Sequence, residues 1–115
     1  MERIDTYRKW LEKEGIPVIT SHSVPDVTKV SLEPWPRKGG RGAYINLVGC
    51  ERITDCYICE IPPGQSLLPQ RHLYKELIYI LSGKGRTEVW VDGKIRQSFK
   101  WQEGSLFSPP LNAWH

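Results

Sequence analysis

The chain of 115 residues lacks several features that define large classes of protein. No apolar stretch approaches the roughly 18 residues that a transmembrane helix needs. The opening segment MERIDTYRKWLEKEG has no apolar core of the kind that a secretory signal requires. The formal net charge of +3 is small and scattered, which argues against nucleic acid or a membrane as partner. The three cysteines, an odd number, fit a reducing compartment better than a disulfide framework, so we expect a cytoplasmic protein.

The N-terminal third differs in pattern from the rest of the chain. Residues 2–14 place Tyr7, Trp10 and Leu11 at helical spacing, and Gly15 is a suitable C-terminal stop. Residues 16–42 are rich in Pro, Ser and Gly without a clear period, which predicts an extended arm with loops. The chain is long enough for one hydrophobic core. We therefore expect a helix and arm over 1–42 and a folded domain over 43–115.

Five short segments after residue 42 are rich in β-branched and aromatic residues, as strands are. Turn signals separate these segments, and the Asp92-Gly93 pair between two of them is a strong hairpin signal. Short strands at roughly ten-residue spacing indicate an all-β sandwich or barrel. The expected strands are 43–48, 54–61, 76–82, 86–92 and 95–101.

The segment CYIC at 56–59 has the spacing of a redox or zinc motif, but two observations favour a structural role. Residues three apart on a strand face opposite sides, and TDCYICEI reads as a strand. The chain has no second Cys pair to complete a zinc site. We therefore interpret Cys56 and Cys59 as structural.

A polar cluster at Gln70, His72 and Glu76 stands out, because the chain has only three histidines. Side chains of an extended chain alternate between two faces, so these three even-numbered residues are expected on one face. Ile78 and Ile80 continue that face, which predicts that it is buried. A buried imidazole, carboxylate and amide are unfavourable unless each is satisfied, and a metal ion would satisfy them together. His22, in the arm, has no partner motif and is interpreted as incidental.

Five aromatic residues of this region have two interpretations. They either line a pocket or fill the core, and the alternation of faces favours core packing for each. These residues are Tyr74, Tyr79, Trp90, Trp101 and Trp114.

Two segments resemble the sequence motifs of the cupin family. The first motif, G(X)5HXH(X)3–4E(X)6G, keeps every spacing, with an amide where the family has its first His. Its positions here are Gly64, Gln70, His72, Glu76 and Gly83.

The second motif, G(X)5PXG(X)2H, follows in the correct order. It is matched by Gly104, Pro110, Asn112 and His115, with Asn112 where the family has Gly. Asn is among the few residues that tolerate a left-handed backbone, so the turn is expected to be kept. The resemblance covers about residues 43–115.

The resemblance implies an antiparallel jelly-roll barrel with a divalent metal held by His72, Glu76 and His115, and by Gln70 as a fourth ligand. Fe is favoured, and Mn, Zn and Ni remain open. Glu76 would be ligand and base, and Gln70 would orient water or substrate. The implied activity is dioxygen-dependent oxidation of a small organic or aromatic substrate. A homodimer formed through residues 1–42 is also implied.

Three alternatives remain open at this point. The first is an isomerase or lyase with the same ligands, the second is a ligand-binding or sensor module without catalysis, and the third is a barrel without metal. The chain ends at His115, whereas a closed barrel normally adds further strands. We therefore expect a barrel that is incomplete at its C-terminus, as part of a longer product, a cleaved chain or a barrel completed by a partner.

Overall fold

The computed structural model describes residues 6–50 and 54–115, which divide into two compact units. Unit 1 extends to Leu68 and unit 2 begins at Pro69. No helix among the described residues has the length and apolar character needed to cross a membrane. The elements are α1 (Thr6–Glu14), β1 (Val18–Ser21), η1 (Val27–Lys29), β2 (Glu33–Trp35), β3 (Gly40–Leu47), β4 (Cys56–Glu60), β5 (Ile78–Tyr79), β6 (Lys84–Val89), β7 (Gln97–Gln102) and β8 (Leu106–Phe107).

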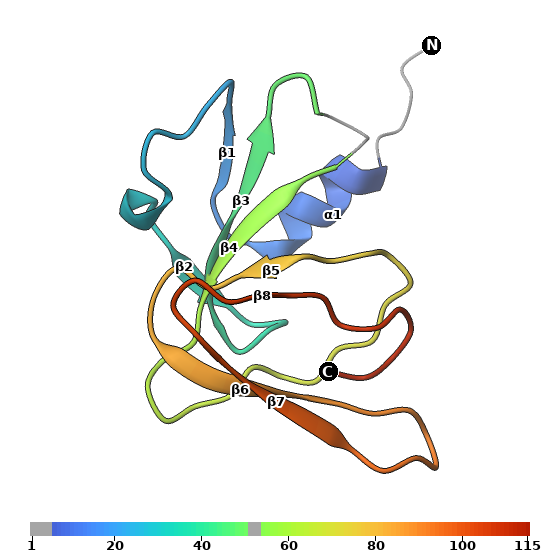
Figure 1. Ribbon diagram of the computed structural model, residues 1–115. Helices are drawn as coiled ribbons and strands as arrows, with labels where there is room; N and C mark the ends of the chain where they lie inside the picture. The colour runs from blue at the N-terminus through green and yellow to red at the C-terminus, as the bar shows by residue number, and fades with distance from the viewer. Residues whose placement is uncertain (1–5, 51–53) are drawn as a thin grey trace. The chain divides into compact units, whose positions relative to one another are not determined.

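Unit 1 is built on a four-stranded sheet in which β3 is the central strand (Figure 1). One edge of β3 pairs with β4, and its other edge is shared by β2 near the start and β1 near the end. The β1–β3 pair is parallel, whereas every strand pair among the described residues of the predicted 43–115 domain is antiparallel. The segment predicted as an extended arm over 16–42 contains β1 and β2, which both pair with β3 in the sheet. Strands of four and three residues are too short to show a period in the sequence.

The core of unit 1 lies between α1 and this sheet. Leu11, Ile16, Trp35 and Tyr44 are buried together, and the Trp10 ring meets Tyr44 edge-on with 5.5 Å between centroids. The helix predicted over 2–14 is confirmed from Thr6 onward, and its residues 2–5 lie outside the described ranges. It ends as expected before Gly15, which has a φ of 70°.

The buried charged residues of unit 1, Glu14 and Lys38, each contact groups that stabilise the charge. The carboxylate of Glu14 forms an ion pair with Arg37 and accepts a hydrogen bond of 3.3 Å from the Tyr44 hydroxyl. Burial, and then the charge of Glu14, raises the pKa of Tyr44, so this phenol stays protonated and continues to donate. Lys38 is 2% exposed, and its ammonium lies 4.4 Å from the Tyr57 ring centroid and 3.0 Å from the Tyr57 hydroxyl. Aromatic faces and a hydroxyl thus replace water around this charge.

The cysteines of β4 face opposite sides, as their spacing predicts. Cys59 packs against the core of unit 1, whereas Cys56 is exposed. Desolvation, and then the Asp55 carboxylate, raises the pKa of the Cys56 thiol. Because the thiolate is the reactive form, this thiol is poorly suited to redox chemistry.

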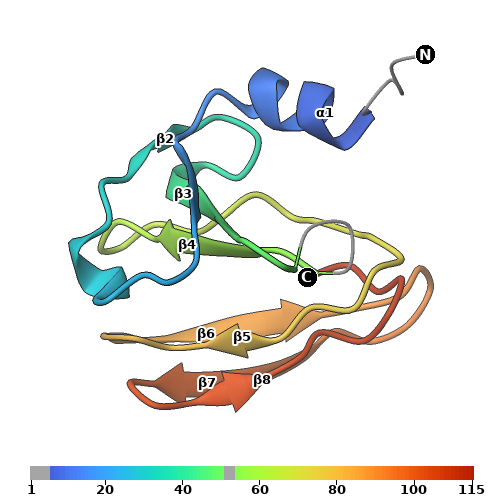
Figure 2. The same ribbon diagram turned by 90° about the horizontal axis from the view of Figure 1, so that it is seen from above.

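Unit 2 consists of two antiparallel strand pairs, β5–β8 and β6–β7 (Figure 2). Phe99 of β7 and Phe107 of β8 meet edge-on with 5.0 Å between ring centroids. Trp90 and Trp114 form an isolated antiparallel bridge beyond β6. The predicted β-rich fold is confirmed, but the strands in the described ranges do not close into a barrel.

The predicted strands exist with shifted ends. Those predicted over 43–48, 54–61, 86–92 and 95–101 correspond to β3, β4, β6 and β7. The fifth, over 76–82, is reduced to the two residues of β5, because only Ile78 and Tyr79 pair with β8. The predicted domain boundary at residue 42 falls within β3, whereas the compact units divide after Leu68.

The hairpin predicted at Asp92-Gly93 joins β6 to β7. The Lys94 amide donates to the Val91 carbonyl at 2.9 Å, which places Asp92 and Gly93 at the centre of a four-residue turn. Gly93 has a φ of 76° while Asp92 does not adopt a positive φ, so the turn lacks the two left-handed residues of a type I′ hairpin. The connection between the strands is correspondingly long, from residue 90 to residue 96.

Substitution of Gly42 by Ala is expected to destabilise unit 1 by about 2 kcal/mol, because the methyl group would overpack the core. A Cβ at Gly42 would lie 2.3 Å from the Trp35 ring and 2.9 Å from the Ile58 carbonyl oxygen. Urea unfolding followed by tryptophan fluorescence measures the effect. Thr20→Ala, at an exposed position of β1, is the control and should change stability by less than about 0.5 kcal/mol. Equal stability of Gly42→Ala and the native chain would contradict this packing.

Candidate metal centre

The segment from Gln70 to Ile80 presents alternate side chains to two different environments. Gln70, His72, Ile78 and Ile80 are partly buried and Glu76 is buried, whereas the odd-numbered residues 71–79 are all exposed. The alternation therefore extends beyond the two-residue strand β5, because an extended backbone alternates its side chains without ladder hydrogen bonds. The predicted face is confirmed, with Tyr74 as its exception.

Main-chain hydrogen bonds attach this segment to residues 112–115. The Gln70 amide donates to the His115 carbonyl at 2.8 Å, and the His115 amide donates to the Gln70 carbonyl at 2.9 Å. Two residues further on, the Asn112 amide donates to the His72 carbonyl at 2.9 Å. These bonds bring the two sequence motifs together, so His115 lies beside a segment more than thirty residues earlier in the chain.

Asn112 shapes the turn that directs residues 113–115 toward this segment. Its φ of 59° is left-handed, as the motif predicted for this position. The Arg71 Nε donates to the Asn112 side-chain oxygen at 2.9 Å and to its carbonyl at 3.1 Å. Asn is thus favoured twice, by the backbone conformation and by its side-chain acceptor.

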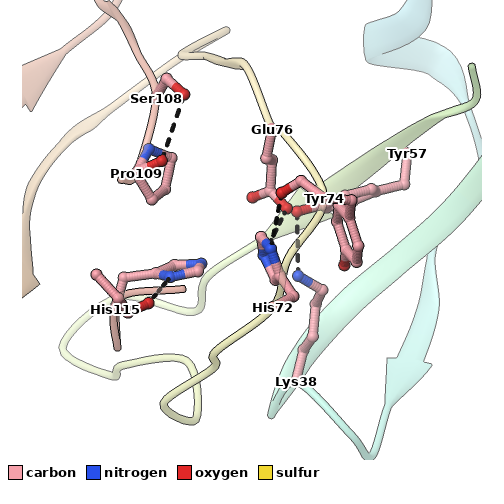
Figure 3. Close-up of polar contacts among 9 residues, drawn as sticks. Lys38, Tyr57, His72, Tyr74, Glu76, Ser108, Pro109 and His115 are labelled. Atoms are coloured by element: carbon pink, nitrogen blue, oxygen red, sulfur yellow. Dashed lines mark hydrogen bonds and ion pairs between the residues drawn. The ribbon is translucent and has the colours of Figure 1, made fainter. Parts of the chain in front are cut away.

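His72, Glu76 and His115 form a compact cluster (Figure 3). One potential ligand atom from each residue lies within 4.8 Å of those of the other two. The His72 Nε2 is 3.3 Å from the Glu76 Oε2, and the two imidazole rings are nearly perpendicular with 4.9 Å between centroids. In the described part of the chain, no other group of three His, Cys, Asp or Glu residues has this proximity.

Backbone carbonyls define the tautomer of both histidines. The His72 Nδ1 lies 3.1 Å from the Tyr74 carbonyl oxygen, and the His115 Nδ1 lies 3.3 Å from the Ala113 carbonyl oxygen. A carbonyl oxygen only accepts, so each Nδ1 carries a proton and donates. In each neutral ring the Nε2 then holds the lone pair. Outer hydrogen bonds of this kind orient the histidine ligands of protein metal sites.

The residues fit a divalent metal on the evidence of one buried nitrogen. The His72 Nε2 is buried and makes no hydrogen bond to any described residue, although the Glu76 carboxylate is close. A lone pair on a neutral imidazole and an ionised carboxylate repel each other unless a cation lies between them. Either a proton shared between Nε2 and the carboxylate or a metal ion bound by both groups resolves this repulsion, and two imidazoles with one carboxylate are a common ligand set for divalent transition metals.

The other predicted site residues have different positions. Gln70 lies next to His115 through the two main-chain hydrogen bonds, and its side chain is partly buried. His22 is exposed on unit 1, after β1.

Tyr74 is the residue near the site that sequence reasoning misjudged. Core packing was expected, but the side chain is 54% exposed and its ring stacks on His72 with 3.9 Å between centroids. Its spacing of two from His72, which puts both on one face, was the available signal. Core packing was also wrong for Tyr79, which is 60% exposed.

Comparison with known proteins gives no match: no family model, curated protein or solved structure resembles the chain significantly.

Replacing Asn112 by Ala is expected to destabilise unit 2 by about 1–2 kcal/mol, because Ala in a left-handed conformation is strained. Replacement by Gly removes the strain but also loses the acceptor for Arg71, so Asn112→Gly should be the more stable of the two variants. Thermal unfolding followed by circular dichroism ranks the three proteins. If Asn112→Ala matches the native chain, the left-handed turn is not required.

Proposed function

We propose that the chain is a metal-dependent enzyme domain of the cupin type that oxidises a small organic or aromatic substrate with dioxygen. The observation that carries the proposal is the proximity of His72, Glu76 and His115, with each imidazole Nδ1 engaged by a carbonyl. The spacing of both sequence motifs supports the same ligand set.

Two imidazoles and one carboxylate would hold the ion, and this set with open positions is typical of non-haem Fe(II) oxygenases, so Fe is our first choice and Mn, Zn and Ni are the alternatives. When bound, the metal would supply Lewis acidity and open coordination positions for dioxygen or substrate. The side chain of Gln70 is a weaker donor than an imidazole. It would complete the site as a fourth ligand or as a hydrogen-bonding group that orients water or substrate.

The protein's own groups would contribute orientation, proton transfer and exclusion of water. Glu76 is 8% exposed, so its carboxylate is held in a poorly solvated environment in which electrostatic interactions are strong. One of its oxygens would bind the ion, and the other would accept a proton from the substrate. Ile78 and Ile80 continue the same face and would keep water from the far side of the site.

Two alternatives use the same residues. An isomerase or lyase would need the ligands but no dioxygen, and a small-molecule sensor would bind metal or ligand without turnover. Gln70 favours the sensor, because the amide weakens the ligand set relative to the family motif. We also propose that the protein acts as a homodimer, which light scattering would test.

The purified, untagged protein is expected to contain about one divalent transition metal per chain, as measured by inductively coupled plasma mass spectrometry. His72→Ala should reduce the content to below about a tenth, because two ligands cannot hold the ion. His22→Ala, a matched change at an exposed histidine, should keep the native content. If the native protein contains no metal, even after incubation with Fe(II), Mn(II), Zn(II) or Ni(II), the proposed site is wrong and the alternative of a barrel without metal is supported.

Oxygen uptake by the Fe(II)-loaded protein should distinguish the enzyme classes. With a panel of small aromatic and organic acids, we expect substrate-dependent uptake that falls at least about a hundredfold in Glu76→Gln. Glu103→Gln, at an exposed position of unit 2, is the control. Turnover under anaerobic conditions with Zn or Mn would instead indicate an isomerase or lyase. Stoichiometric metal without any turnover would favour the sensor.

A further inference from the structure

We propose that Tyr74 is a positioning residue that holds the His72 imidazole in its ligating orientation through ring stacking. The proposal rests on the metal site proposed above. It assigns a role to a side chain that neither motif includes.

The stack between the two rings is close and almost parallel. The ring centroids of His72 and Tyr74 are 3.9 Å apart and the ring planes differ by 5°. The His72 side chain is 14% exposed, whereas Tyr74 is 54% exposed. Tyr74 therefore covers one face of the imidazole while its own outer surface remains in solvent.

The hydrogen bond at Nδ1 restricts the orientation of the His72 ring but leaves one rotation of the ring unrestrained. A single contact of 3.1 Å to the Tyr74 carbonyl lets the imidazole tilt about the line that joins nitrogen and oxygen. The Nε2 lone pair lies in the ring plane, so a tilt of the ring changes its direction relative to Glu76, whose Oε2 is 3.3 Å from Nε2. A flat ring against the imidazole resists that tilt, because tilting breaks the aromatic contact.

Tyr74 makes two contacts with His72, one through its main-chain carbonyl and one through its ring, and substitutions of Tyr74 change only the second. The carbonyl belongs to the main chain and remains in every variant at position 74. The ring is removed by Tyr74→Leu, which keeps an apolar side chain of moderate size, and is kept by Tyr74→Phe. Because the side chain is more than half exposed, its removal should change the stability of the metal-free protein little.

The test measures the affinity of the full chain for Co(II), by competition with a chromophoric chelator, and the visible absorption spectrum of the cobalt-loaded protein. Tyr74→Leu should weaken the affinity by about tenfold, the lower end of the range for groups that support metal ligands. Its visible bands should also shift, because the ligand field changes with the His72 orientation. Tyr74→Phe should retain both native properties, since the hydroxyl is not part of the stack.

Tyr79→Leu is the matched control, because it makes the same change at a tyrosine that is 60% exposed in the same unit. It should bind Co(II) as the native chain does. Native affinity and native bands in Tyr74→Leu would overturn the positioning role, and so would an equal loss in Tyr79→Leu or in Tyr74→Phe. If the native chain itself binds no Co(II), the proposed metal site is wrong, and the positioning role of Tyr74 is rejected together with it.

Discussion

The candidate site depends on main-chain hydrogen bonds between two distant segments. Gln70 and His115 each donate an amide to the other's carbonyl, and His72 accepts from Asn112. These three bonds pair the segment that carries His72 and Glu76 with the segment that carries His115. The chemistry of the side chains is thus secondary to a register between backbones, and the left-handed turn at Asn112 makes that register attainable.

Local features of the fold were predictable from the sequence because they depend on near neighbours. The end of α1 at Gly15, the position of Cys56 and Cys59 on opposite sides of β4, and the left-handed Asn112 each follow from a few consecutive residues. Features that depend on distant partners were not predictable. The parallel pairing of β1 with β3 leaves no period in a four-residue strand, and the shortness of β5 depends on where β8 lies.

The site was predictable where its residues follow the alternation of an extended chain. Gln70, His72 and Glu76 share a face because they are separated by even numbers of residues in an extended chain. The spacing of the second motif predicted that His115 would join them, and His115 lies close to His72 and Glu76. The same rule misjudged Tyr74, although its number is also even. Alternation gives the direction of a side chain but not how much of the face is covered. A ring that stacks on His72 at the edge of the face is left half in solvent.

Each histidine of the cluster takes its tautomer from a carbonyl two residues away, downstream for His72 and upstream for His115. Which ring nitrogen carries the proton is therefore determined within two segments of three residues each, 72–74 and 113–115. A segment of this kind can be transferred to another protein as a whole. A designed scaffold that joins two such segments in the same register would obtain the protonation of both imidazoles from the main chain alone.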